Sequence, residues 1–298
     1  MKKILFIFLV FTHPVFSFGQ KKDTKLQKKL EEAIKGFNGD VGIYVKNLRT
    51  GKTASLNADT IFPTASIVKV PILIGMMDKI HRGELAYDST LIYKDSLLYE
   101  GEDILGSFKS GEKVLLKKVI MLMLTTSDNT ASLWLQSLAG TGTRINEILD
   151  SLDFIYTRIN SRTPGRENNR TQFGWGQTTP REMGTLFEKI YRNEIFSVAA
   201  CDRMMRSLGR NYWDLNEAIS QLPPYIEVFS KNGCVNASRS EVLLVNAPHN
   251  PYIFSIFTKN NKDTQWTHNN EAWTTARKIS LMLWRYFEKK DQWEPPAK

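Results

Sequence analysis

A serine and a lysine, three residues apart in an apolar segment, are the residues of this chain best suited to chemistry. They are Ser66 and Lys69, within the segment PTASIVKVPI. On a helix the two side chains would share a face. A lysine in apolar surroundings has its pKa lowered by desolvation, so it could take the proton from the serine hydroxyl. The pair therefore predicts a serine nucleophile activated by a lysine.

The position of the serine in its helix would add to this chemistry. If the helix begins near Ala65, Ser66 lies in the first turn, where its backbone N–H has no helical partner and could face a developing oxyanion. We expect Thr64 to cap this helix. The tetrad S-x-x-K also arises by chance about once or twice in a chain of this length. A second copy, Ser110 to Lys113, contains a glycine and precedes a helix, and we interpret it as chance.

Histidine-based and metal-based chemistry are poorly supported. A serine triad needs a histidine held by a carboxylate, but no G-x-S-x-G segment is present and only three histidines follow the first twenty residues. No pair of histidines or cysteines has the spacing of metal ligands. We interpret the histidines as surface or packing residues, and the sequence predicts neither a metal nor a cofactor. They are His81, His249 and His268.

Two further motifs accompany the serine and lysine. Ser127-Asp128-Asn129 stands at the start of a predicted helix, and Lys231-Asn232-Gly233 lies in a predicted strand. S-x-x-K, S-D-N and K-x-G, in this order and at these separations, resemble the serine penicillin-recognising enzymes, and more narrowly the class A β-lactamase family. The resemblance covers nearly the whole chain after residue 19. It includes the segments SIVKVP, SDNTA and the TTP that opens a later helix.

The resemblance implies a role for each of the residues that carry it. Ser66 resembles the acylated nucleophile and Lys69 the lysine that helps to activate it. Ser127 would pass a proton to the leaving nitrogen. Asn129 would hold the lysine and the substrate amide, and Lys231 would attract the substrate carboxylate.

The same resemblance implies a substrate-binding strand. The backbone N–H groups of Ser66 and Cys234, beside Gly233, would form an oxyanion hole. Arg239 resembles the arginine that gives the family a second anchor for the substrate carboxylate, because its fork can bind a carboxylate through two hydrogen bonds. Asn232 stands where the family has a threonine or serine. Its amide can still donate to the carboxylate, and we expect altered substrate preference or weaker binding.

One loop departs from the family. The family uses a glutamate there to activate the water that removes the acyl group, but that place falls on Thr163 in the loop RINSRTPGRENNRTQFGWGQTTP. The only carboxylate of the loop, Glu167, comes four residues later. It could serve as a displaced base or be a solvent-exposed loop residue, and both interpretations stay open. Asn168 and Asn169 are weaker candidates for holding the water.

The elements that would position these residues come from both ends of the chain. Hydrophobic periodicity predicts a helix over 24–36, a hairpin over 40–59, then a series of helices. Three strands follow the pair Pro223-Pro224, and an amphipathic helix closes the chain. The predicted helices of the middle are 64–80, 115–124, 130–138, 144–152, 180–191 and 197–208.

This order predicts the fold class. It is α/β (α+β), with an antiparallel sheet flanked by helices and an inserted all-helical lobe, as in the serine β-lactamase and transpeptidase-like proteins. We expect a single catalytic domain over 20–298. Its mixed lobe would comprise 20–60 and 212–298, and its helical lobe 61–211. A cleft between the lobes would hold the chemistry.

The first nineteen residues resemble a signal peptide. Lys2 and Lys3 precede the apolar run ILFIFLVF, and small residues at Ser17 and Gly19 suit a signal peptidase. A membrane anchor is the alternative, but the run is well short of the ~20 residues that a spanning helix needs. We therefore expect cleavage near Gly19 and export to the periplasm.

Charge and cysteine content limit the partners. The formal net charge is +9, and the densest basic run, KKDTKLQKK, is interpreted as the polar face of a helix. Nothing around it is typical of nucleic-acid recognition. The two cysteines, Cys201 and Cys234, are expected to be free. With no signal for oligomerisation, the sequence predicts a monomer whose partner is a small molecule, either a β-lactam or a peptide ending in D-Ala.

Two functions remain open at this point. The first is a serine β-lactamase that acylates Ser66 and then releases the product. The second is a penicillin-binding or peptidase-like relative, or a non-catalytic binder, whose acyl-enzyme persists. The loop that contains Glu167 and the identity of Asn232 are the features that separate them.

Overall fold

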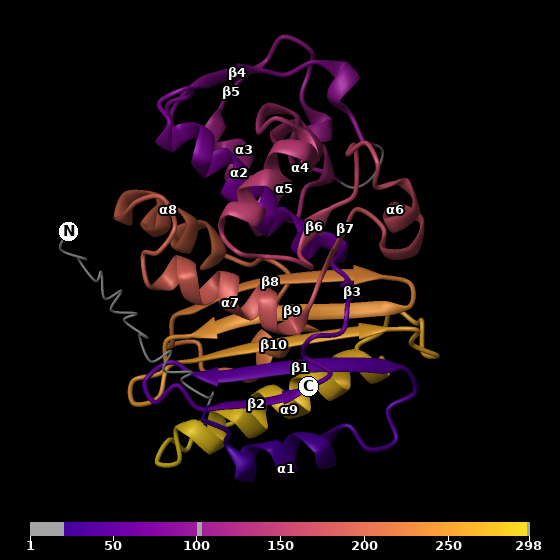
Figure 1. The fold of residues 1–298 in the computed structure, drawn as a ribbon, viewed down its shortest axis with the longest axis vertical. Coiled ribbons are helices and arrows are strands. Elements are labelled where there is room, and N and C mark those ends of the chain that lie inside the picture. Colours follow the sequence, from indigo (N-terminus) through magenta and orange to yellow (C-terminus); the bar gives the residue numbers. More distant parts are fainter. Residues whose placement is uncertain (1–20, 100–102, 297–298) are drawn as a thin grey trace, which may run out of the picture.

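A computed structural model describes residues 21–99 and 103–296. The predicted signal peptide lies outside the described residues. Two lobes lie one above the other in Figure 1, one built on a sheet and the other mostly of helices.

The sheet joins the two ends of the chain. Its five strands are antiparallel and lie in the order β2-β1-β10-β9-β8. Strand β1 pairs with β10 along its whole length, from Asp40 opposite Lys259 to Asn47 opposite Tyr252. The strands are β1 (Asp40–Asn47), β2 (Thr53–Leu56), β8 (Val228–Val235), β9 (Ser238–Val245) and β10 (Tyr252–Lys259). The prediction that the N-terminal hairpin and the C-terminal strands share a sheet is confirmed.

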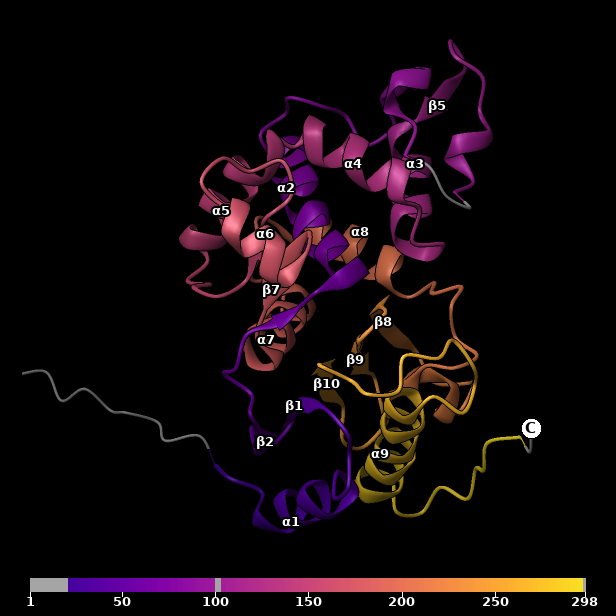
Figure 2. The same ribbon diagram turned by 90° about the vertical axis from the view of Figure 1, so that its right-hand side faces the viewer.

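Helices cover both faces of this sheet (Figures 1 and 2). Helices α1 (Thr24–Ala33) and α9 (Glu271–Phe287) pack on one face, where Leu30, Ile43 and Leu283 belong to one core. Helix α7 (Pro180–Tyr191) packs on the other face. Strands buried on both faces need apolar residues at successive positions. This explains why EVLLV in β9 does not alternate.

The other lobe forms around α2 (Lys69–His81). Its residues from Lys69 to Asp78 are all buried, because neighbouring helices surround it. Those neighbours are α3 (Leu116–Thr125), α4 (Asn129–Leu138), α5 (Thr141–Ser151) and α8 (Val198–Leu208). All of these helices were anticipated from sequence to within a few residues.

Short strands and one further helix in this lobe were not anticipated. Strands β3 (Phe62–Pro63), β7 (Gly176–Thr178) and β6 (Arg158–Ile159) form a small sheet, and β4 (Thr90–Ile92) pairs with β5 (Lys113–Leu115). The loop predicted over 158–180 contains α6 (Glu167–Phe173). Single-turn 3₁₀ helices, named η1 (Ala65–Val68), η2 (Asp95–Leu97), η3 (Leu105–Ser107) and η4 (Ala218–Gln221), complete the description. The inserted lobe is therefore mostly, not wholly, helical.

The lobes meet where η1 lies against β8. This contact brings the start of α2 next to the strand that carries the K-x-G motif. Among the described helices, none is both long enough and apolar enough to cross a membrane.

Candidate active site

Ser66 lies in the tight turn η1 that precedes α2. The preceding residue, Ala65, has a φ of +44°, a strained value for a residue with a side chain. Gly233 of β8 packs directly against this turn, since a Cβ on it would lie 2.4 Å from Thr64 O and 2.9 Å from Ser66 N. Only glycine lets the strand approach so closely.

The prediction that Thr64 caps the helix is wrong. Its backbone is already in the helical region and its side chain makes no capping hydrogen bond. Its backbone N–H instead donates to Gly176 O at 3.0 Å, which ties the turn to β7. The shape of the turn thus comes from its neighbours in space.

Lys69 lies beneath Ser66 with its side chain fully buried. Its Nζ is 3.1 Å from Ser66 Oγ, 3.0 Å from Ser127 Oγ and 2.8 Å from Asn129 Oδ1, and it also donates to Ser127 O. The structure therefore brings together the residues of the first two motifs around one amine.

The protonation state of Lys69 follows from its surroundings. Burial lowers its pKa well below the ordinary value, and the positive charge of Lys231 lowers this pKa further. A neutral amine has two N–H donors and one lone pair. Asn129 Oδ1 and Ser127 O are acceptors that use the two donors, so the lone pair is left for a hydroxyl. Lys69 is thus suited to take a proton from Ser66.

Two carboxylates fix the start of α4, directly after Ser127. Asp128 caps the helix by accepting from Ala131 N, and Asp103 Oδ2 accepts from Asn129 N at 2.9 Å. Ser127 itself has a φ of +62°, a second strained position beside the same amine. Asp103 was not identified from sequence, because it lies in a loop remote from the motif.

Lys231 approaches Ser127 from the sheet. Its Nζ donates to Ser127 Oγ at 3.1 Å and to Asn232 O at 2.9 Å, and its side chain is fully buried. Burial lowers its pKa to about 8, against the opposing effect of neighbouring acidic groups. The hydroxyl of Ser127 therefore lies between two lysine amines, which suits a group that relays a proton.

We expected the side chain of Asn232 to face the cavity, but it does not. Its Oδ1 lies 3.3 Å from Lys231 Nζ and its Nδ2 donates to Glu217 Oε1 at 3.0 Å. The side chain is buried. Its amide is thus used within the protein and is not directed at a substrate carboxylate.

The expectation that Arg239 anchors the substrate carboxylate is wrong. Successive residues of a strand face opposite sides of the sheet, and it is Ser238 that lines the cavity. The guanidinium of Arg239 stacks on Trp266 and Trp273, with its carbon 4.2 and 4.8 Å from the ring centroids. It also donates to backbone carbonyls, including that of Gln265 at 3.2 Å. Arg239 therefore ties β9 to the segment before α9.

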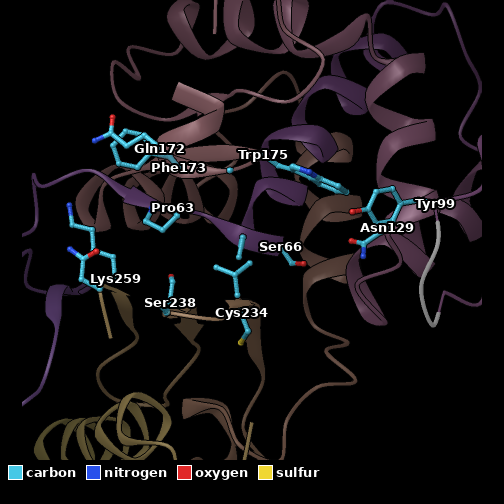
Figure 3. Close-up of a pocket in the computed structure, with 15 residues that line it drawn as sticks. Pro63, Ser66, Tyr99, Asn129, Gln172, Phe173, Trp175, Cys234, Ser238 and Lys259 are labelled. Atoms are coloured by element: carbon cyan, nitrogen blue, oxygen red, sulfur yellow. The ribbon is translucent and has the colours of Figure 1, made fainter. Parts of the chain in front are cut away.

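A cavity of about 540 Å³ opens over Ser66 between the lobes. Figure 3 shows Asn129, Tyr99 and Trp175 near Ser66, and Lys259 toward the opposite end. The rings of Tyr99 and Trp175 meet edge to face at 5.2 Å. These two aromatic residues and Lys259 were not identified from sequence, because no motif contains them.

Cys234 borders the cavity below Ser66, as an oxyanion hole formed by the two backbone N–H groups would require. Burial raises the pKa of its thiol to about 12, so the sulfur is not a nucleophile at neutral pH. Cys201 lies on α8, and both cysteines are free.

Glu167 lies on the surface. It begins α6, is exposed, and accepts a hydrogen bond from Gly165 N at 3.1 Å. Among the described residues that line the cavity, the loop contributes a segment from Gln172 to Trp175, not Glu167. Thr163 is buried and turned toward Gly142 of α5.

A polar network holds this loop in place. Arg166 Nε donates to Asn160 Oδ1 at 2.7 Å, and its guanidinium also donates to Gln177 Oε1 at 2.9 Å. Asn169 Nδ2 donates to the same Gln177 oxygen at 3.0 Å. Asn169 is therefore engaged within the loop. Within the described ranges, no three of the His, Cys, Asp and Glu side chains group closely enough to hold a metal.

The model of a protein family described as "Beta-lactamase enzyme family" matches residues 25–287. The chain belongs to the beta-lactamase enzyme family. The match spans every motif described above, and membership makes this protein a hydrolase by family.

Known proteins match this chain in sequence or in structure along most of its length. Beta-lactamase VEB-1 of Pseudomonas aeruginosa is 24% identical over 96% of this chain and 98% of its own. The structure of PBP-A superposes with a TM-score of 0.79 at 24% identity, over 91% of this chain and 98% of that chain. The structure of the TLA-1 extended spectrum beta-lactamase also superposes with a TM-score of 0.79, at 17% identity, over 88% of this chain and 98% of that chain. These structural likenesses confirm the predicted fold.

Proposed function

We propose that this member of the family is a serine β-lactamase of class A type, which opens β-lactam rings through an acyl-enzyme on Ser66. The observation that carries the proposal is the buried amine of Lys69, which contacts Ser66, Ser127 and Asn129 at once. Its relatives VEB-1 and TLA-1, both beta-lactamases by name, support the substrate class. We also propose a monomer exported to the periplasm after loss of the signal peptide.

The first half of the reaction follows from the contacts. Neutral Lys69 takes the proton of Ser66 Oγ as the oxygen attacks the lactam carbonyl carbon. The N–H groups of Ser66 and Cys234 stabilise the oxyanion. When the C–N bond breaks, Ser127 gives its proton to the leaving nitrogen and regains one from the Lys69 ammonium. The acyl ester on Ser66 and a neutral Lys69 remain.

The second half requires water to attack that ester. The loop holds its only carboxylate, Glu167, at the surface, and this favours a second candidate in which the ester persists. The similarity to PBP-A, a mutant of which is known as an acyl-enzyme complex with penicillin G, points the same way. That candidate is a penicillin-binding relative with the same nucleophile.

The test is the intact mass of the protein against time after addition of benzylpenicillin. We expect an adduct equal to the mass of the penicillin that appears and then decays while penicilloate accumulates. The Ser66→Ala variant should give no adduct. A stable adduct would support the penicillin-binding candidate instead, and neither adduct nor penicilloate from the wild type would contradict both.

A further inference from the structure

A buried acidic pair lies behind the strand that carries Lys231. Glu241 of β9 stands directly opposite Asn232 of β8, so both side chains emerge on the same side of the sheet. Glu217 immediately precedes η4 and accepts from Asn232 Nδ2 at 3.0 Å. Both carboxyl groups are buried, with exposed fractions of 6% for Glu217 and 3% for Glu241. Carboxyl groups that are so nearly buried need a structural or chemical reason.

The pair is held in place by the backbone of η4 and by α9. Glu241 accepts from Ala218 N at 2.6 Å and from Ile219 N at 3.3 Å, which fixes the start of η4. Arg277 of α9 donates to Asn216 O at 2.7 Å from the other side. The carboxylate of Glu217 therefore cannot move far from Asn232.

Hydrogen bonding fixes the orientation of the Asn232 amide. As an ammonium, Lys231 is only a donor, so Asn232 presents Oδ1 to it. An ionised Glu217 carboxylate is only an acceptor, so it receives Nδ2. Ser127 then completes a continuous path from Glu217 through Asn232 and Lys231 to the amine of Lys69.

The two carboxyl groups do not both ionise at neutral pH. Burial and the charge of Glu217 raise the pKa of Glu241 to about 8, so Glu241 keeps its proton. Burial also raises the pKa of Glu217, but N–H groups of Asn216 and Asn232 and the charge of Lys231 oppose that rise. Geometry separates the two groups, because only Glu217 accepts from the Asn232 amide that contacts Lys231.

Groups from each neighbouring element act on Lys231. They are Lys69 from α2, Cys234 from β8, Glu241 from β9 and Glu217 before η4, with Arg277 from α9 beside Glu217. The Cys234 thiol is neutral, because its pKa is about 12. The carboxylate of Glu217 faces Lys231 through Asn232. Lys69 faces the charge of Lys231, which lowers its pKa, and Asp103 and Asp128, each of which raises that pKa by less than Lys231 lowers it.

We propose that Glu217 is a positioning residue, which acts through Asn232 to make Lys231 the charged member and Lys69 the neutral member of the two buried lysines. Two ammonium groups on either side of the Ser127 hydroxyl would repel, so only one lysine holds its proton readily. The negative charge of Glu217 favours protonation of Lys231, the lysine on the sheet. The catalytic consequence rests on the proposed function, since Lys69 must be neutral to activate Ser66 and Lys231 charged to attract an anionic substrate.

The division of charge can be measured without any substrate. Lysine side chains enriched in ¹³C at Cε report their protonation by NMR, with Lys69→Arg and Lys231→Arg spectra to assign the two signals. In the wild type, we expect Lys231 to titrate at a higher pH than Lys69. The reverse order would overturn the proposal, and the titration itself is made on the wild-type protein.

Glu217→Gln and Glu241→Gln form a matched pair of buried, nearly isosteric changes. Glu217→Gln should lower the titration midpoint of Lys231 by about one pH unit or more, because it removes the charge near the ammonium. Glu241→Gln replaces a carboxyl group that is already neutral, so it should shift the titration midpoint of Lys231 much less. Equal shifts in both variants, or none in Glu217→Gln, would contradict the role of Glu217.

The pH dependence of the acylation rate then links the charge of Lys231 to the reaction. The alkaline limb of the acylation rate against pH should move to lower pH in Glu217→Gln and should not move when Lys231→Arg is already present, because arginine keeps its charge. If the wild type is never acylated, the proposed function fails, while the NMR titration still decides the role of Glu217.

Discussion

The amine centre around Ser66 and the loop over 158–180 lie on the same cavity but are built in different ways. The amine of the fully buried Lys69 contacts Ser66 Oγ, Ser127 O and Asn129 Oδ1. In the loop, the internal contacts join Arg166 to Asn160 and Gln177, while Glu167 faces solvent. Burial shifts the pKa of a group strongly and fixes its geometry, and exposure does neither. The chain is thus organised for forming the acyl-enzyme, and the loop is organised chiefly for its own stability.

The largest effect should come from the amine centre. Lys69→Met should slow acylation by benzylpenicillin by about a thousandfold, because a general base typically contributes 10²–10⁴-fold. Stopped-flow or mass measurement of adduct formation would test it. Lys113→Met is the matched control, since this exposed lysine belongs to the second S-x-x-K segment and should leave the rate unchanged. A loss of less than tenfold in Lys69→Met would mean that another group takes the proton.

An intermediate effect should come from the network of the loop. Arg166→Ala removes the donor to Oδ1 of the buried Asn160 and one of the two donors to Gln177 Oε1, which should lower the free energy of unfolding by about 1–3 kcal/mol. Urea denaturation would measure it, with acylation expected to change less than about threefold. Arg170→Ala changes an exposed arginine of α6, the helix that Arg166 precedes, and should be nearly neutral. A thousandfold loss of acylation in Arg166→Ala would show that the loop and the amine centre are coupled.

The smallest effect should come from Glu167. Glu167→Gln should change the lifetime of the acyl-enzyme by no more than about twofold, because substitutions at exposed positions rarely change energies by more than ~0.5 kcal/mol. The measurement is the decay of the adduct after excess penicillin is removed. An adduct that becomes long-lived only in Glu167→Gln would show that this carboxylate reaches the ester, and the contrast between the two regions would then disappear.

Local signals in the sequence were sufficient for most of the fold. Helix α7 has the predicted bounds, since Thr179 caps it and Pro180 occupies its first turn. The motifs predict correctly that Ser66, Lys69 and Ser127 lie together. Each of these residues stands at or near the start of a helix, where local sequence signals are strong. For such residues, the spacing along the chain is enough to predict that they share one site.

The errors concern residues whose partners are distant in the chain. The side of the sheet on which Arg239 lies depends on the register of its hairpin, and a shift of one residue exchanges the faces. Its partners Trp266 and Trp273 come from another segment. Asn232 likewise meets Glu217 from a loop that carries no recognisable motif. Such pairings are properties of the assembled structure and have no signature in a single sequence.

The pairing of β1 with β10 also determines the order in which the molecule can be completed. Asp40 and Asn260, hydrogen-bonded across the ends of these strands, are 220 residues apart in the chain. Closing so long a loop has an entropic cost that precedes any gain from the contact, and such topologies fold slowly. During synthesis the first hairpin must wait, with one edge unpaired, until the last quarter of the chain emerges. The nascent protein therefore spends most of its synthesis without a completed sheet, a state in which this part of the chain can still be threaded through a narrow passage.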